Sequence, residues 1–224
     1  GNEKKIAPCI ACNQACLDHT FSGKISSCLV NPKACFETEL ISTKALNKKS
    51  VAVVGAGPAG MSAAIEAAER GHEVTLFEKA QAVGGQLNLA KMVPGKEEFW
   101  GLVDWFEEML NTSGVDVRLG KTVTSADVMG FDEVIVATGV VPRDPKIKGQ
   151  EKNNVVSYAE VLNGEGKIGQ KVAVVGAGGI GFDVSEYLVH ETRSDFKQIE
   201  IPHWMKEWGV GDPEQTAGGL AESG

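Results

Sequence analysis

Residues 51–60 read VAVVGAGPAG, an apolar run of strand length that passes directly into three closely spaced glycines. Gly55 predicts a tight turn out of the strand, Gly57 lets the backbone approach a diphosphate, and Gly60 lets a helix pack closely on the strand. The helix that begins there would present free N–H groups to an anion. The stretch therefore predicts the phosphate-binding turn of a dinucleotide site.

The residues after this turn complete a strand–turn–helix–strand unit. Pro58 is tolerated in the first turn of a helix, and the alanine-rich residues 59–70 predict that helix. Residues 73–78 predict a second strand ending in Glu78, 18 residues past Gly60, where a carboxylate can accept hydrogen bonds from a ribose diol. We interpret the unit as a dinucleotide-binding βαβ unit, with a nucleotide-free α/β domain as the alternative.

Two further motifs favour FAD at this first site. The pair Gly84-Gly85, followed by Gln86, would let the backbone lie along a long cofactor, although a flexible loop has the same composition. Ala137-Thr138-Gly139 follows the apolar run at 133–136 and resembles the short motif of flavoproteins that bind two dinucleotides, in which a strand returns near the flavin.

The opening motif recurs about 120 residues further on, as an internal repeat. Residues 171–175 predict a strand and residues 182–191 a helix, separated by a glycine turn that would hold NAD or NADP. The glycines of that turn are Gly176, Gly178 and Gly181. No further strand follows, so we expect an incomplete unit. Arg193 is the nearest candidate for reading the ribose 2′ position, and the choice between NADH and NADPH stays open.

All five cysteines lie in the first 35 residues. Four of them follow the spacing Cys-x2-Cys-x3-Cys-x11-Cys: Cys9, Cys12, Cys16 and Cys28. Three thiols in one loop can wrap a compact [4Fe-4S] cluster, whereas structural zinc usually takes two separated knuckles. We predict the cluster, with zinc or free thiols as alternatives, and interpret Cys35 as a buried bystander or as a neighbour of the cluster ligands.

Composition limits the partners of the chain. Its 224 residues carry a net charge of −8 and a pI near 5.1, which argues against a nucleic acid or an anionic membrane as partner. No apolar run reaches the roughly 18 residues of a membrane span, and residues 1–10 lack the layout of a signal peptide. We therefore expect a cytoplasmic location.

These elements predict an α/β fold in three parts. Residues 1–47 would be an irregular Cys-rich segment, 48–150 a three-layer, Rossmann-like FAD-binding domain, and 151–224 the truncated start of an NAD(P)-binding domain. Within the second part, apolar spacing predicts a helix over 99–111 and alternation predicts a strand over 115–119.

The motifs together resemble those of bacterial 2,4-dienoyl-CoA reductases and their relatives among the old-yellow-enzyme-type NADH:flavin oxidoreductases. The resemblance covers nearly the whole chain and rests on four stretches: CIACNQACLD at 9–18, SCLVNP at 27–32, PGKEEF at 94–99 and GGIGFD at 178–183.

The resemblance implies a larger enzyme, in which a TIM barrel with FMN precedes a cluster segment and an FAD domain split by an NADPH domain. Electrons would pass from NADPH to FAD, through the [4Fe-4S] cluster to FMN, and then to an unsaturated thioester. The cluster ligands would be Cys9, Cys12, Cys16 and Cys28. The FAD contacts would include Ala59, Glu78, Gln86 and the region of Val123.

This chain resembles an internal fragment of such an enzyme, without the N-terminal barrel that would be its partner. We predict no general acid or nucleophile among its side chains. Two other classes remain open: a thioredoxin-reductase-like pyridine nucleotide-disulfide enzyme that uses Cys9 and Cys12, and a non-catalytic FAD-binding scaffold with structural zinc. The substrate, the oligomeric state and the retention of cofactors are not determined by the sequence.

Overall fold

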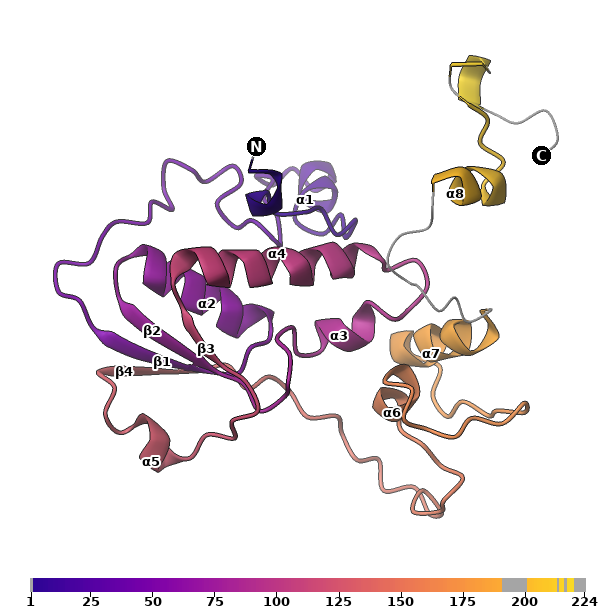
Figure 1. Cartoon of the computed structure of the whole chain (residues 1–224). Helices are drawn as coiled ribbons and strands as arrows, with labels where there is room; N and C mark the ends of the chain where they lie inside the picture. The colour runs from indigo at the N-terminus through magenta and orange to yellow at the C-terminus, as the bar shows by residue number, and fades with distance from the viewer. Residues whose placement is uncertain (1, 191–200, 213, 216, 220–224) are drawn as a thin grey trace. The chain divides into compact units, whose positions relative to one another are not determined.

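The computed structural model of the chain describes residues 2–190, 201–212, 214–215 and 217–219 (Figure 1). In chain order the elements are η1 (Glu3–Lys5), α1 (Leu17–Phe21), β1 (Ser50–Val54), α2 (Pro58–Glu69), β2 (Glu73–Phe77), α3 (Leu87–Ala90), α4 (Glu98–Ser113), β3 (Asp116–Arg118), α5 (Ser125–Val128), β4 (Glu133–Val136), α6 (Tyr158–Leu162), α7 (Gly179–Val189), α8 (Ile201–Glu207) and η2 (Ala217–Gly219). The expected helix and strands of the first βαβ unit are present, with ends shifted by at most one residue.

The four described strands form one parallel sheet in the order β3-β2-β1-β4. β1 pairs with β2 so that Val51 lies beside Val74, and β4 pairs with the other edge of β1. Parallel neighbours need a crossover connection, and α2 provides the one between β1 and β2. The predicted α/β fold with a Rossmann-like sheet is confirmed.

Two helices, α2 and α4, lie on one side of this sheet (Figure 1). Helix α4 carries Leu102, Phe106 and Leu110 at four-residue spacing, so their side chains share one face, and all three are buried. They pack with α2, β1 and β2 in one apolar cluster. Its buried members are Val51, Val53, Ala56, Met61, Ala64, Ile65, Val74, Leu76, Val83, Leu102, Phe106 and Leu110.

A second, smaller apolar cluster joins the segment after α3 to helices α6 and α7. Its buried members are Val93, Val161, Leu162 and Val184. The cluster belongs to the same compact unit as the sheet, Gly1–Val189, whereas His190–Gly224 forms a second unit. The boundaries expected near residues 47 and 150 stay predictions.

The strand expected over residues 171–175 is wrong. These residues form no strand, and the side chains of Val172, Val174 and Val175 are 50%, 40% and 82% exposed. A strand needs a hydrogen-bonded neighbour and a covered face, and the described sheet contains only β1–β4. The helix expected after them is present as α7.

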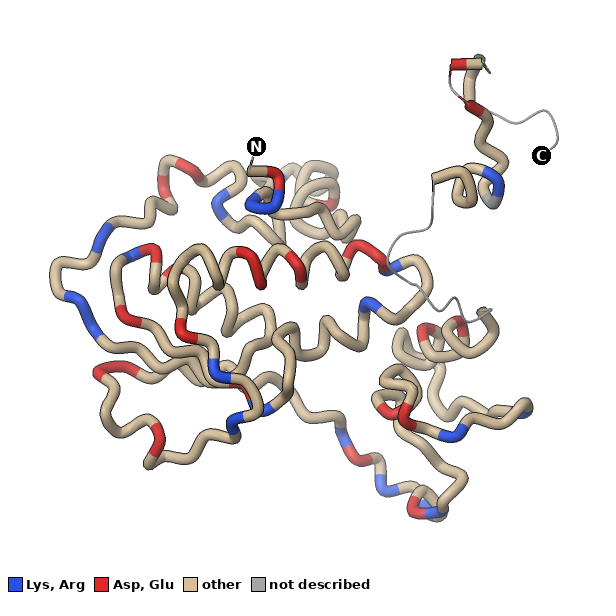
Figure 2. The backbone as a smooth tube through the Cα atoms, in the orientation of Figure 1, with Lys and Arg blue, Asp and Glu red and all other residues tan. Residues whose placement is uncertain are grey.

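The unit His190–Gly224 contains helix α8, and the ring of Trp204 on this helix stacks on the ring of Trp208, just past its end, with centroids 6.2 Å apart. Arg193, the candidate for the ribose 2′ position, lies outside the described residues. None of the helices in the described part of the chain is both long and apolar enough to span a membrane. Acidic and basic residues are interspersed along the described chain (Figure 2).

Candidate functional site

The first glycine loop joins the end of β1 to the start of α2. Gly55 has a φ of +105°, a conformation that favours glycine, and an added Cβ would collide with the carbonyl group of Ala137. A Cβ on Gly60 would collide with the carbonyl oxygen of Gly55. Backbone lies directly against backbone at both positions, as predicted for a helix packed tightly on its strand.

Gly57 is a different case, because its backbone is extended, with φ −74° and ψ 177°, and an added Cβ would meet no atom within 4 Å. Neither strain nor packing within the chain requires glycine there. The open space adjoins the N-terminus of α2, whose first turn has no acidic residue and no side-chain cap. Uncapped N–H groups beside open space fit a diphosphate, so the residues present fit the predicted FAD.

Glu78 reaches the same loop from the end of β2. The residue is only 8% exposed. Its Oε2 accepts a hydrogen bond from the backbone N–H of Ala56 at 2.7 Å, and its Oε1 accepts one from the N–H of Ala80 at 2.9 Å. A carboxylate offers about four acceptor positions, so Glu78 retains capacity for ribose hydroxyls. The predicted ribose acid therefore lies beside the glycine loop.

The glycine pair that follows β2 lies against the other side of the loop. The N–H of Gly84 donates to the carbonyl oxygen of Ala56 at 2.8 Å. An added Cβ on Gly85, where φ is +55°, would lie 3.0 Å from the Cα of Gly57. Glycine at this position allows two backbone segments to approach each other, whereas the predicted approach of this pair to a cofactor stays a prediction.

The segment Ala137-Thr138-Gly139 completes the group from the end of β4. The N–H of Ala137 donates to the carbonyl oxygen of Val54 at 2.8 Å, which continues the β1–β4 pairing to the edge of the loop. Just beyond Gly139, the carbonyl oxygen of Val140 accepts a hydrogen bond from Gln86 Nε2 at 3.3 Å. The glycine pair with Gln86 and the Ala137-Thr138-Gly139 segment, which are far apart in the sequence, thus lie next to each other.

Val123 is half-buried in the segment after β3. Two residues before it, the N–H of Lys121 donates to the carbonyl oxygen of Glu78 at 2.8 Å. The residues predicted for the first site therefore gather at the carboxyl ends of β1, β2 and β4, where open parallel sheets bind their ligands. Their contact with FAD stays a prediction.

The second glycine loop repeats the backbone geometry of the first. Gly176 has a φ of +123°, and a Cβ on Gly181 would collide with the carbonyl oxygen of Gly176. In the same way, a Cβ on Gly60 would collide with the carbonyl oxygen of Gly55 in the first loop. Gly178, like Gly57, has nothing within 4 Å of its Cβ position. The first turn of α7 contains no acidic residue. This loop also fits an incoming diphosphate, although no strand leads into it.

A cavity of about 610 Å³ lies between parts of the two sites. Gln86 and Val140 line it from the first site, and Gly176 and Ile180 line it from the second. The volume falls in the range of about 300–1,000 Å³ that is usual for small-molecule sites. The second glycine loop therefore borders a cavity whose other wall includes Gln86 and Val140 of the first site.

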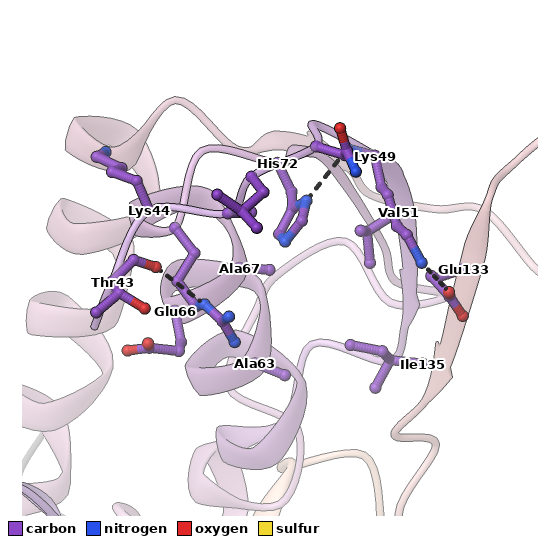
Figure 3. Close-up of a pocket in the computed structure, with 14 residues that line it drawn as sticks. Thr43, Lys44, Lys49, Val51, Ala63, Glu66, Ala67, His72, Glu133 and Ile135 are labelled. Carbon is purple, nitrogen blue, oxygen red and sulfur yellow. Dashed lines mark hydrogen bonds and ion pairs between the residues drawn. The ribbon is translucent and has the colours of Figure 1, made fainter. Parts of the chain in front are cut away.

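A larger pocket of about 850 Å³ lies elsewhere, toward the amino ends of β1 and β4 (Figure 3). Its polar groups bind one another: the N–H of Lys49 donates to His72 Nδ1 at 3.2 Å, and Lys49 Nζ pairs with Glu133 at 2.6 Å. The Glu133 carboxylate raises the pKa of Lys49. We interpret this pocket as the junction between residues 43–49 and the sheet, because ligands of parallel sheets bind at the opposite end.

The cysteine segment folds as two arms held together by hydrogen bonds. The N–H of Ser27 donates to the carbonyl oxygen of Ala15 at 2.7 Å, so the arm that ends in Cys28 lies beside the arm that carries Cys16. Cys9 Sγ accepts a hydrogen bond from the N–H of Ala11 at 3.4 Å. Ala11 has a φ of 53° and Asn13 a φ of 56°, values that are uncommon for non-glycine residues and that cluster at functional loops.

Among the residues that the structure describes, no three His, Cys, Asp or Glu side chains form a group able to hold a metal ion. The ligand set Cys9, Cys12, Cys16 and Cys28 therefore stays a prediction. The donor set and the N–H···S hydrogen bond fit a thiolate-bound centre. The interpretation of Cys35 as buried is wrong, because this residue is exposed and has a φ of +63°.

A polar network that the sequence did not reveal holds the cysteine segment to α2. Lys33 Nζ donates to Ser42 Oγ at 2.6 Å, and Ser42 Oγ donates to Glu66 Oε2 at 2.9 Å. Ile10 and Val30 also pack against the main apolar cluster. The partners are far apart in sequence and follow no period, so no sequence pattern could have indicated the network.

The chain is similar to known oxidoreductases over most of its length. Residues 49–201 match the pyridine nucleotide-disulphide oxidoreductase family. The chain is 41% identical over 199 residues to an NADH oxidase of Thermoanaerobacter brockii, a match that covers 85% of this chain and 31% of that protein. It is 37% identical over 207 residues to a metal reductase of Desulforamulus reducens, covering 90% of this chain and 31% of that protein.

Among solved structures, a complex of 2-naphthoyl-CoA reductase with 2-naphthoyl-CoA superposes with a TM-score of 0.78 at 33% identity. This match covers 83% of the chain and 29% of the reductase. The chain thus spans about a third of the length of the proteins that it resembles.

Proposed function

The chain belongs to the pyridine nucleotide-disulphide oxidoreductase family, and from this premise we propose that it is the electron-transfer part of an NAD(P)H-dependent iron-sulfur flavoprotein reductase. The observation that carries the proposal is a pair of glycine loops, each with a positive φ at its first glycine and a close backbone approach at its last, of which the second borders a cavity that is also lined by Gln86 and Val140 of the first site. Two diphosphates held at the N-termini of α2 and α7 would bring two dinucleotides to the same space.

In this proposal the first loop, Glu78 and Gly85 hold FAD, and the second loop holds the nicotinamide nucleotide. The bound cofactors supply hydride and electron transfer, and the chain supplies their binding and orientation. Gly57 leaves room for the diphosphate, and Glu78 accepts hydrogen bonds from the ribose. Gln86, tied to Val140, fixes the wall of the cavity between the two sites.

The iron-sulfur part of the proposal rests on the spacing of Cys9, Cys12, Cys16 and Cys28 and on the docking of their segment. The Lys33–Ser42–Glu66 network and the packing of Ile10 and Val30 attach that segment to the FAD-binding sheet. Electron transfer needs a fixed separation between centres, and this attachment would provide it.

We further propose that the complete protein reduces a carbon–carbon double bond of an enoyl thioester, as 2,4-dienoyl-CoA reductases do. The likeness to 2-naphthoyl-CoA reductase supports a thioester substrate, and the likeness to an NADH oxidase supports a nicotinamide donor. Because the chain spans about a third of these relatives, we assign substrate reduction and FMN to a barrel domain outside it.

A second candidate is a disulfide-exchanging enzyme in which Cys9 and Cys12 form a redox pair. The family match and the two-residue spacing favour it. The two candidates differ in iron: a cluster requires iron and sulfide, whereas a redox disulfide requires neither.

The test is purification without oxygen, followed by analysis of flavin, iron, acid-labile sulfide and zinc. We expect FAD together with about four irons and four sulfides per chain, and visible absorption that dithionite bleaches. Flavin without iron, together with two more titratable thiols after reduction than before it, would instead establish the disulfide enzyme. Zinc without iron would establish a scaffold with a structural metal.

A further inference from the structure

The second glycine loop and its helix need contacts other than the chain connection to be held in place. Residues 140–157 connect β4 to this part of the chain, contain no helix or strand and are mostly exposed. An exposed connection of this kind does not fix the orientation of the helices beyond it. The placement of α7 therefore depends on contacts between side chains distant in sequence.

Lys96 and Asp183 make such a contact. Lys96 Nζ lies 2.6 Å from Asp183 Oδ2, and the two side chains are 38% and 29% exposed. Hydrogen bonds between ionised groups are shorter and stronger than neutral ones. Val93 and Val184, both buried in the smaller apolar cluster, lie three residues before Lys96 and one after Asp183. The ion pair thus borders an apolar contact that partly shields it from water.

The lysine end of the pair is fixed to the part of the chain that carries the sheet. The N–H of Lys96 donates to the carbonyl oxygen of Val93 at 3.1 Å, and its carbonyl oxygen accepts from the N–H of Phe99 at 3.2 Å. Helix α4, which starts at Glu98, packs into the main core through Phe106. Movement of Lys96 is therefore coupled to the sheet that carries the first glycine loop.

The aspartate end belongs to the second site. Asp183 lies on α7, two residues after Gly181, the last glycine of the loop. A displacement of Asp183 would therefore move α7, the helix whose N-terminus would face the diphosphate. Lys96 also neutralises a carboxylate close to a helix end that should attract an anion.

We propose that the Lys96–Asp183 ion pair positions the second glycine loop relative to the first site, whose residues Gln86 and Val140 line the same cavity. This inference rests on the proposed function, since two bound dinucleotides exchange hydride only at about 3–3.5 Å. A change of about 1 Å in the placement of α7 would slow that exchange as much as 100-fold without touching either cofactor. The pair is a positioning element, and neither residue contacts the reacting atoms.

The test uses Lys96→Gln, Asp183→Asn and the charge swap Lys96→Asp with Asp183→Lys. Lys148→Gln, which alters an exposed lysine of the connection, is the matched control. One readout is amide hydrogen exchange of residues 179–189 without any nucleotide. The other is the rate of flavin reduction by NADH or NADPH at saturating concentration, measured separately from nucleotide affinity.

We expect both single variants to exchange faster in α7 and to slow flavin reduction by about 10- to 100-fold. Their FAD content and their reduction by dithionite should stay unchanged. The charge swap should recover most of the protection and of the rate, while the Lys148 variant should match the parent protein.

Unchanged exchange in both single variants would overturn the proposal. Faster exchange with an unchanged rate at saturating nucleotide would also overturn it, because the pair would then be structural only. If neither nucleotide reduces the flavin of the parent protein, the proposed function fails. In that event the exchange of α7 still shows whether the pair fixes the second loop.

Discussion

The carboxylate of Glu78 accepts a hydrogen bond from the backbone N–H of Ala56 at 2.7 Å, and this bond joins the end of β2 to the middle of the first glycine loop. The residue is almost fully buried, and its other oxygen accepts from Ala80 at 2.9 Å. One side chain thus holds the loop in shape and offers its remaining acceptor positions to a ribose.

Glu78→Gln should weaken both roles. The amide has one acceptor oxygen, so its NH2 group would face one of the two backbone N–H donors and leave it unsatisfied. We expect a loss of about 1–3 kcal/mol in the free energy of unfolding of the apoprotein and at least tenfold weaker FAD binding. Denaturant unfolding and flavin fluorescence titration measure the two effects. FAD affinity equal to that of the parent would contradict the ribose role.

Gly57→Asp should separate FAD binding from folding. The extended backbone accepts any residue, and aspartate is a favoured helix N-cap, so the apoprotein should gain a few tenths of a kcal/mol. The new carboxylate would repel the diphosphate, and FAD affinity should fall about 100-fold or more. Gly57→Ala adds bulk without charge, so its loss of affinity should be smaller. Retained FAD in the aspartate variant would place the diphosphate elsewhere.

Gly60→Ala and Gly181→Ala should each force backbone apart within one loop. The added Cβ collides with the carbonyl oxygen of Gly55 or of Gly176, and overpacking of this kind costs about 1–3 kcal/mol. We expect the first variant to lose FAD and the second to keep FAD but bind nicotinamide nucleotide more weakly.

The control for both glycine variants is Gly101→Ala on α4. An added Cβ there meets nothing within 4 Å, so the free energy of unfolding should rise by about 0.5–1 kcal/mol. Thermal unfolding and equilibrium dialysis with each nucleotide report on all three variants. Loss of FAD from the Gly181 variant would show that the two loops do not bind independently.

Cys12→Ser and Cys35→Ser should differ in iron content. Cys12 is half-buried and belongs to the predicted ligand set, whereas Cys35 is exposed and lies outside it. We expect the Cys12 variant to lose most of its iron and sulfide, and the Cys35 variant to match the parent. Equal iron in both variants would remove Cys12 from the ligand set.

Asp132 should make stability depend on pH at the start of the sheet. Its Oδ2 accepts hydrogen bonds from the backbone N–H and the hydroxyl of Ser50, both at 2.7 Å, and these bonds lower the pKa of the carboxyl below 3.8. A lowered folded pKa adds stability above the unfolded pKa, and that stability is lost as pH falls through the folded value. The free energy of unfolding of the Asp132→Asn variant should therefore fall less than that of the parent between about pH 5 and about pH 3. Denaturant midpoints across that range measure the difference, and parallel curves would contradict it.

The motifs of the first site were readable from the sequence because each is local. The strand at 51–54, the glycine turn and Glu78 lie within one βαβ unit, and the period of apolar residues reports which face is buried. The order of parallel strands then brings the glycine loop, Gly85 and Ala137 to one edge of the sheet.

Pairs that depend on packing across the chain could not be predicted. Lys33 with Ser42 and Glu66, and Lys96 with Asp183, join side chains that follow no period, so their partners emerge only when helices and loops are placed. Residues 171–175 are the opposite case, because their local pattern predicted a strand that the structure does not form. Their composition is that of a strand, but a strand exists only with a hydrogen-bonded neighbour, and no described strand lies beside them.

The amino-acid order alone thus established the α/β class, the two glycine turns and the acid that follows β2, because apolar period and glycine conformation act over a few residues. Three-dimensional packing established which backbone lies against which glycine, how the cysteine segment is attached to α2, and how α7 is tied to the sheet. Those features depend on distances between residues far apart in the chain, and such distances are set when the core forms.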